Sequence, residues 1–175
     1  MKSGILVLVT VLLVLSTSGF AQEKSKKQLK EERKIEAQKQ TEVLMNSKVF
    51  VFVGRTAQPS STRTIDLTTN TNYVKFSPEL IESSMPFFGQ AYSGIGYGGD
   101  QGLKFEGKPE KFIIKKGKKN YQIDAEVKGT NDRYKLSLSI SFGGGLASLT
   151  IISNNRSPIS YIGELSAPEK PKEKK

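Results

Sequence analysis

The sequence predicts a mainly β fold: an antiparallel meander that forms a sandwich or a partly closed barrel and is preceded by one N-terminal helix. Three observations predict it. Polarity switches at every second residue over 121–127 and again over 134–142, turn residues recur between the apolar runs, and no helical crossover separates them. Each alternating strand buries one face and leaves the other in water, so the sheet must pack on a shared apolar interior.

Residues 1–21 have the features of a secretory signal peptide. Lys2 supplies the positive charge, residues 5–15 are an apolar run, and small residues precede a cleavage point after Ala21 that leaves Gln22 first. The alternative is an anchor that is never cut, but the run is too short to span a bilayer stably. Because cysteine is absent, a lipid anchor is excluded. We therefore expect an exported protein, periplasmic or extracellular, with no stable membrane span after cleavage.

The two ends of the mature chain are charged. Residues 22–47 lack Gly and Pro and are rich in Glu, Lys and Gln, which predicts a solvated helix or spacer without a continuous apolar stripe. We expect its last turn to dock on the domain through Val43 and Leu44, and a partner-binding helix is the alternative. Residues 166–175 are polar and Pro-rich, which predicts a disordered tail. The β-rich domain of unknown function is then residues 48–165.

The strands follow in order along this domain. The apolar run 49–53 predicts a strand covered on both faces. Further strands are expected at 64–67, 73–76, 103–105, 112–114, 121–127, 134–142, 146–152 and 159–165. Between them, Lys115 to Lys119 predicts a hairpin tip with Gly117 at a positive φ. The tip is interpreted as a solvated turn, and contact with anionic lipid or phosphorylated sugars is the functional alternative.

Residues 77–101 are rich in Pro and Gly, show no clean period, and predict the longest irregular stretch of the chain. Within it, the loop 85–101 holds the residues that we regard as a candidate ligand or partner site, namely Phe87, Phe88, Tyr92, Gly96 and Tyr97. For the two phenylalanines, the favoured interpretation is that they plug one end of the β core. The glycines around Gly96 lack the flanking strand and helix of a dinucleotide site, so no cofactor is expected.

Composition excludes several functions. Histidine and cysteine are absent, which removes Ser-His-Asp and Cys-His catalysis and the commonest metal ligands, so no metal site is expected. The net charge of +10 is spread along the chain, whereas nucleic-acid binders gather it on one face, so no nucleic-acid partner is expected. Asp124 and Glu126 share a strand face about 6.7 Å apart. They leave carboxylate-only glycoside hydrolysis open, although the favoured interpretation is the polar face of an amphipathic strand, where charges are expected.

Several runs look familiar as a set. They are VFVFVGRTA at 49–57, LIESSMPFFG at 80–89, GLKF at 102–105 and ISYIG at 159–163. Together they resemble a family of exported proteins of unknown function from Bacteroidetes-type Gram-negative bacteria, over residues 40–165. The resemblance implies a periplasmic or surface location. It implies no activity and assigns no functional residue.

The sequence thus favours a non-enzymatic binding module that engages an envelope protein or a small ligand through the loop 85–101. Two alternatives stay open. One is a glycan-acting enzyme that uses carboxylates alone. The other is an inhibitor of a foreign hydrolase, which would present the same loop on a rigid β scaffold.

Overall fold

The computed structural model describes residues 25–60, 63–92, 102–130, 132–143 and 145–168. Contacts divide the chain into two compact units, residues 1–33 and 34–175. The sheet and the second half of the helix α2 (Lys26–Ser47) belong to the second unit. The architecture described below is that of this second unit.

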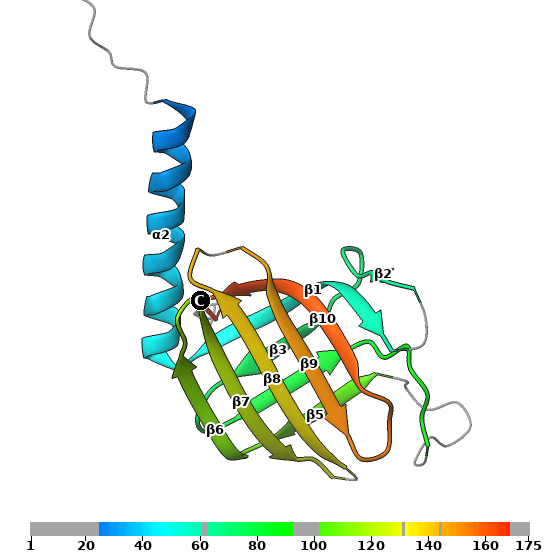
Figure 1. Cartoon of the computed structure of the whole chain (residues 1–175). Coiled ribbons are helices and arrows are strands. Elements are labelled where there is room, and N and C mark those ends of the chain that lie inside the picture. Colours follow the sequence, from blue (N-terminus) through cyan, green and yellow to red (C-terminus); the bar gives the residue numbers. More distant parts are fainter. Residues whose placement is uncertain (1–24, 61–62, 93–101, 131, 144, 169–175) are drawn as a thin grey trace, which may run out of the picture. The chain divides into compact units, whose positions relative to one another are not determined.

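Ten strands form one antiparallel sheet (Figure 1). They are β1 (Phe50–Pro59), β2 (Ile65–Asp66), β3 (Tyr73–Phe76), β4 (Ile81–Met85), β5 (Leu103–Gly107), β6 (Pro109–Lys116), β7 (Asn120–Lys128), β8 (Arg133–Ser141), β9 (Ala147–Ser153) and β10 (Ile159–Ser166). Their order in the sheet is β5-β4-β3-β1-β10-β9-β8-β7-β6, and β2 pairs with β1. The sheet therefore consists of two meanders, β3–β5 and β6–β10, that are joined where β1 lies between β3 and β10.

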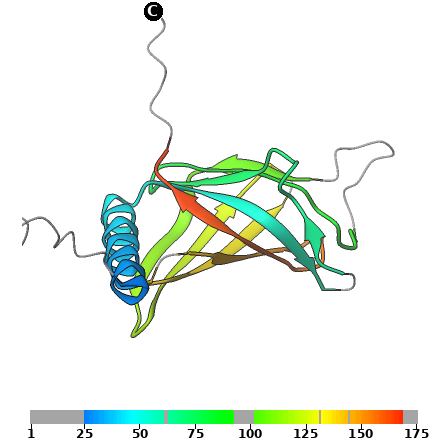
Figure 2. The same ribbon diagram turned by 90° about the horizontal axis from the view of Figure 1, so that it is seen from above.

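The sheet curls on itself until it is nearly closed and barrel-like, which confirms the predicted fold class. Seen from above, the two meanders form two layers across a common interior (Figure 2). The layers approach each other where Gly107 of β5 packs against Val127 and the Lys128 carbonyl of β7. The fully buried interior includes Phe50, Phe52, Leu138, Leu149 and Tyr161.

The alternation that predicted the fold is confirmed in β7 and β8. Tyr121, Ile123, Ala125 and Val127 of β7 are buried, and the residues between them are partly exposed. The same pattern runs along β8. In contrast, the prediction that 49–53 is covered on both faces is wrong. Phe50 and Phe52 are fully buried, but Val53 is 42% exposed because only one face of β1 meets the interior.

Two further local predictions are corrected. Residues 77–101 are not irregular throughout, because β4 occupies 81–85 with Ile81, Ser83 and Met85 facing inward. Gly117 does not adopt a positive φ. Glycine is needed here for another reason. The Gly117 N–H closes the turn by donating a hydrogen bond to the Asn120 carbonyl, and a Cβ on Gly117 would lie only 2.9 Å from the Asn120 side-chain oxygen.

The helix α2 is confirmed, and of its two predicted docking residues Leu44 packs against the core whereas Val43 does not. Thr41 and Met45, one turn apart, are buried, whereas Val43 is 66% exposed. Glu42 on this part of the helix forms an ion pair with Lys116 of β6 at 3.0 Å. Within the described ranges, no helix is both long enough and apolar enough to cross a membrane.

Candidate functional site

The first part of the predicted loop is held in place by the turn between β9 and β10. The Tyr161 hydroxyl donates a hydrogen bond to the Pro86 carbonyl at 2.6 Å. Beyond it, the Ser157 N–H donates to the Gln90 carbonyl and the Tyr92 N–H donates to the Asn155 carbonyl, both at 2.8 Å. Residues 86–92 are therefore a fixed part of the scaffold.

The structure separates the predicted site residues. Phe87 is buried, with the Arg156 guanidinium 5.1 Å from its ring centroid. Phe88 is partly buried against the core. Tyr92 is 66% exposed at the end of the fixed segment. Gly96 and Tyr97 lie outside the described residues, as do Ala21 and Gln22 of the expected cleavage point.

A pocket of about 770 Å³ lies beside β5, the end strand of the sheet. We call it the seam pocket. It is lined by Tyr73, Glu82, Ser83, Ser84, Gly102, Lys104, Phe105, Glu106, Thr130, Asp132, Tyr134, Asn155 and Arg156. One wall is formed by β3, β4 and β5, and the other by the turns that follow β7 and β9. Most of the lining side chains are polar or charged.

Tyr134 and Phe105 form the aromatic part of the seam pocket. Their rings stack with centroids 3.9 Å apart and planes inclined by 10°. Burial raises the pKa of Tyr134, and the nearby Asp132 carboxylate raises it further. Among the described residues, no group forms a hydrogen bond with the Tyr134 hydroxyl. This hydroxyl is thus a neutral donor and acceptor that a ligand in the pocket can use.

Glu82 is a fixed anion on the opposite wall. Lys75 donates a hydrogen bond to one carboxylate oxygen at 2.8 Å, and the Tyr73 hydroxyl donates to the other at 2.5 Å. The hydrogen bond from Lys75, followed by that from Tyr73, holds the pKa of Glu82 below its usual value. Glu106 lies directly across from Glu82 in the pairing of β4 with β5. This wall therefore presents negative charge beside the ammonium groups of Lys75 and Lys104.

Asp132 shapes the other wall. Its carboxylate accepts hydrogen bonds from the backbone N–H groups of Arg133, Asn154 and Asn155, at 2.7, 3.1 and 3.4 Å. It thereby ties the turn after β7 to the turn after β9. These hydrogen bonds hold Asp132, Asn154 and Asn155 in place before any ligand arrives.

Arg156 joins the two walls. Its guanidinium donates a hydrogen bond to the Gly102 carbonyl, just before β5, at 2.8 Å. A second pocket of about 610 Å³, the loop pocket, lies next to the seam pocket and shares Ser84, Gly102 and Lys104 with it. Phe87 and Phe88 line this loop pocket. Two of the predicted residues therefore adjoin the polar pocket without lining it.

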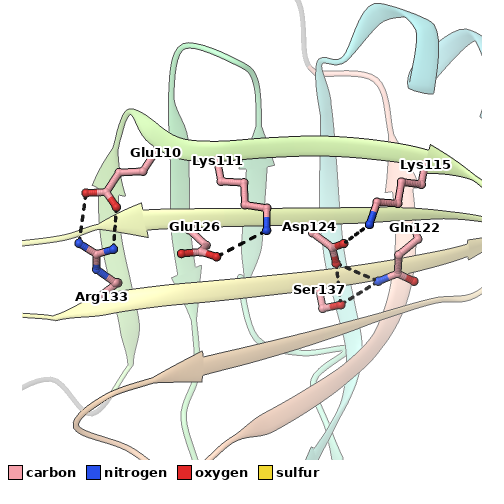
Figure 3. Close-up of polar contacts among 8 residues, drawn as sticks. All are labelled: Glu110, Lys111, Lys115, Gln122, Asp124, Glu126, Arg133 and Ser137. Carbon is pink, nitrogen blue, oxygen red and sulfur yellow. Dashed lines mark hydrogen bonds and ion pairs between the residues drawn. The ribbon is translucent and has the colours of Figure 1, made fainter.

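The carboxylates singled out from the sequence lie elsewhere. Asp124 and Glu126 are on the outer face of β7, where they pair with Lys115 and Lys111 at 3.7 and 3.8 Å (Figure 3). Neither lines the seam pocket or the loop pocket. Throughout the described ranges, no group of three or more acidic side chains is arranged to hold a metal ion.

Fold and site together define a curled antiparallel β domain with a polar pocket beside its end strand. The chain belongs to the DUF4251 family, a domain of unknown function whose profile matches residues 32–165. The expected resemblance to a family of unknown function is thereby confirmed. No curated protein matches the chain.

A solved structure shares the fold. It is the crystal structure of a DUF4251 family protein from Bacteroides eggerthii DSM 20697, with a TM-score of 0.59 and 18% sequence identity. The match covers 76% of this chain and 89% of that one. At this identity the likeness concerns the fold alone.

Proposed function

We propose that this protein is a non-catalytic binding module of the bacterial cell envelope and that the seam pocket is its ligand site. The observation that carries the proposal is the Tyr134 hydroxyl, which has no hydrogen-bond partner among the described residues and lies in a pocket of about 770 Å³. Ligand pockets commonly have this size and place a few polar groups in fixed positions. The hydrogen bonds of Asp132 and Arg156 supply that fixed geometry.

The chemistry of the lining favours a polar, hydroxyl-rich ligand such as a glycan fragment. Ser84, Lys104, Glu106, Thr130 and Asn155 place hydrogen-bonding side chains around the pocket. An apolar ligand would remove water from these groups without replacing their hydrogen bonds, at a cost of about 1–3 kcal/mol for each buried polar group. A sugar presents donors and acceptors on several sides and avoids that cost.

The same residues support a binding role over a catalytic one. The chain has no histidine and no cysteine, so acid–base chemistry would fall to carboxylates. The lowered pKa of Glu82 keeps it ionised at neutral pH, which is opposite to what a general acid requires. Asp132 already accepts three backbone hydrogen bonds.

The envelope location is the part of the proposal that rests on sequence. Residues 1–21 carry the order of charge, apolar run and small residues that export machinery recognises. In cells that make the protein, mass spectrometry of the N-terminus should find Gln22 as the first residue. A mature protein that retains Met1 would contradict export by cleavage.

The ligand proposal is tested by thermal unfolding in the presence of cell-wall glycan fragments and, separately, of fatty acids. A binding glycan should raise the melting temperature of the wild type. Tyr134→Phe keeps the ring but removes the hydroxyl, so the shift should be lost or at least halved. Ser141→Ala is the matched control, because it removes an exposed hydroxyl of β8 that lines neither pocket.

Two outcomes would overturn the proposal. A shift caused by fatty acids alone would exclude a polar ligand. Turnover of a bound glycan that stops in Glu106→Gln would replace the binding module with the carboxylate-only enzyme considered above.

A further inference from the structure

The strand ends that lie away from the seam pocket carry a different surface. β7 begins at Asn120 beside the β6–β7 turn and ends at Lys128, next to the turn that lines the pocket. The Phe142 N–H donates a hydrogen bond to the Lys119 carbonyl at 3.0 Å, which joins the β6–β7 turn to the β8–β9 turn. We call Lys116, Lys118, Lys119, Phe142 and Leu146 the basic tip.

The basic tip holds positive charge that the protein itself does not neutralise. Lys115 and Lys116 have acidic partners, Asp124 at 3.7 Å and Glu42 at 3.0 Å. Lys118 and Lys119 are exposed, and within the described ranges no carboxylate pairs with either ammonium group. Two adjacent cations are therefore available to an external anion.

The same tip exposes apolar surface beside these cations. Leu146 is 57% exposed on the β8–β9 turn. The neighbouring Phe142 is only partly buried, with its ring edge-on to Tyr121 and the Lys116 ammonium 5.8 Å from its centroid. An apolar side chain flanked by lysines matches the boundary between lipid headgroups and acyl chains.

We propose that the basic tip docks on the surface of a bilayer that contains anionic phospholipids. Lys118 and Lys119 meet the headgroup phosphates while Leu146 enters the acyl boundary. A soluble phosphate or sugar phosphate would use the lysines but would leave Leu146 without a role, and this difference favours a membrane. Two lysines and one leucine give weak, reversible association, and the seam pocket at the other end of β7 stays open to solvent.

The test is flotation of the purified full chain with vesicles of phosphatidylcholine alone or with about 30% phosphatidylglycerol. The readout is the ratio of binding to the anionic vesicles over binding to the neutral ones. The apolar run 5–15 contributes equally to binding on both vesicle types, so it does not change this ratio. We expect binding to the anionic vesicles to exceed binding to the neutral ones. The double variant Lys118→Gln/Lys119→Gln should lower the ratio by roughly thirty-fold, because each lysine near an anionic surface contributes about fivefold.

A matched control removes the same charge elsewhere. Lys128→Gln/Lys135→Gln neutralises two exposed lysines near the pocket end of β7 and β8 and should leave the ratio unchanged. Leu146→Ser should weaken binding to anionic vesicles roughly tenfold by removing the apolar contact. Vesicle binding by each variant is measured at a temperature at which its near-UV circular dichroism spectrum matches that of the wild type, so that only folded proteins are compared.

Three results would overturn the inference. The first is equal loss of binding in the tip and control variants, which would indicate attraction by net charge alone. The second is release of the wild type from vesicles by millimolar inorganic phosphate, which would indicate a soluble anion site. The third is an unchanged affinity in Leu146→Ser, which would remove the apolar contact that distinguishes a membrane. None of these results concerns the seam pocket, so the proposed ligand site is tested independently of the basic tip.

Discussion

Gly89 shows how one absent methyl group shapes the loop beside the pockets. A Cβ at this position would lie 2.3 Å from the Ser157 hydroxyl oxygen and 2.6 Å from the Phe87 ring. The Ser157 oxygen accepts a hydrogen bond from the Gln90 N–H, and Phe87 is buried, so neither neighbour moves freely. We expect Gly89→Ala to lower the free energy of unfolding by about 1–3 kcal/mol, the usual cost of overpacking.

Urea denaturation measures this cost, and Gly143→Ala is the matched control. A Cβ at Gly143 would meet nothing within 4 Å, and its φ is not positive. Replacing it should change stability by no more than about 0.5 kcal/mol. If the two variants unfold at the same urea concentration, the close packing of residues 87–90 against Ser157 is not a source of stability.

At the scale of elements, β6 lies at the opposite edge of the sheet from β5, and cross-strand ion pairs hold it in place (Figure 3). Lys111 and Lys115 reach the acidic side chains of β7, and Arg133 of β8 reaches across β7 to Glu110 of β6 at 2.8 Å. Exposed lysines along such an edge also disfavour pairing with the strands of another chain. These ion pairs therefore position β6 more than they stabilise the whole domain.

Loss of the Arg133–Glu110 pair should loosen β6 locally. In Glu110→Gln we expect the amide protons of β6 to exchange faster, while global stability falls by less than about 1 kcal/mol, as is usual for exposed pairs. The difference should shrink at about 1 M salt, where the Debye length is roughly 3 Å. Glu79→Gln is the control, because it removes the same charge from a more exposed pair, with Lys108, outside the strands. Faster exchange of β6 in both variants would contradict a specific role for Arg133.

Strands with strict alternation could be predicted from the sequence, and those whose signal is masked by their neighbours could not. β7 and β8 are long enough for polarity to repeat four times, so their assignment followed directly. β4 has only five residues, and the Pro and Gly around it hid the inward positions of Ile81, Ser83 and Met85. The apolar run of β1 predicts a strand covered on both faces because its outward valines are apolar, although one face of the strand is exposed to water.

The seam pocket lay beyond sequence reasoning for a topological reason. Its walls come from β4, β5 and two distant turns, and only closure of the sheet brings Glu82 near Asp132 and Arg156. The alternation over 134–142 predicts an inward Tyr134, and this residue is buried, but alternation cannot show that its hydroxyl reaches a pocket. The loop 85–101 was singled out by composition, and its described part adjoins the pocket through Phe87 and Phe88.

At the scale of the whole domain, the absence of histidine fixes the pH range of stability. No side chain has an ordinary pKa between that of the carboxylates and that of tyrosine. On the acid side, Glu82 and Glu164 have lowered pKa values because of hydrogen bonds from Lys75 and Arg55. Their contribution is present above the unfolded value of about 4.3 and is lost as the pH falls through the lower folded value. Stability should therefore be nearly constant from about pH 5 to pH 9.

The alkaline limit depends on buried tyrosine. Tyr161 is fully buried in β10, and burial raises its pKa far above that of a free tyrosine. Tyr134 and Tyr73 have raised pKa values as well. A group whose folded pKa is raised binds its proton more tightly in the folded state. Its stabilising effect is therefore complete below the unfolded value of about 10 and is lost as the pH rises past it.

We accordingly expect the melting temperature to fall steeply above about pH 10, with Tyr161 as a main cause. Lysines also lose their charge there, so the diagnostic comparison is Tyr161→Phe, which cannot ionise. This variant loses the hydrogen bond to the Pro86 carbonyl and should start from a lower melting temperature at pH 7. From pH 9 to 11.5, however, its melting temperature should decline less than that of the wild type, so that the two curves converge. Parallel curves would mean that Tyr161 ionises as easily in the folded protein as in the unfolded chain, which is incompatible with a hydroxyl enclosed between Pro86 and the core.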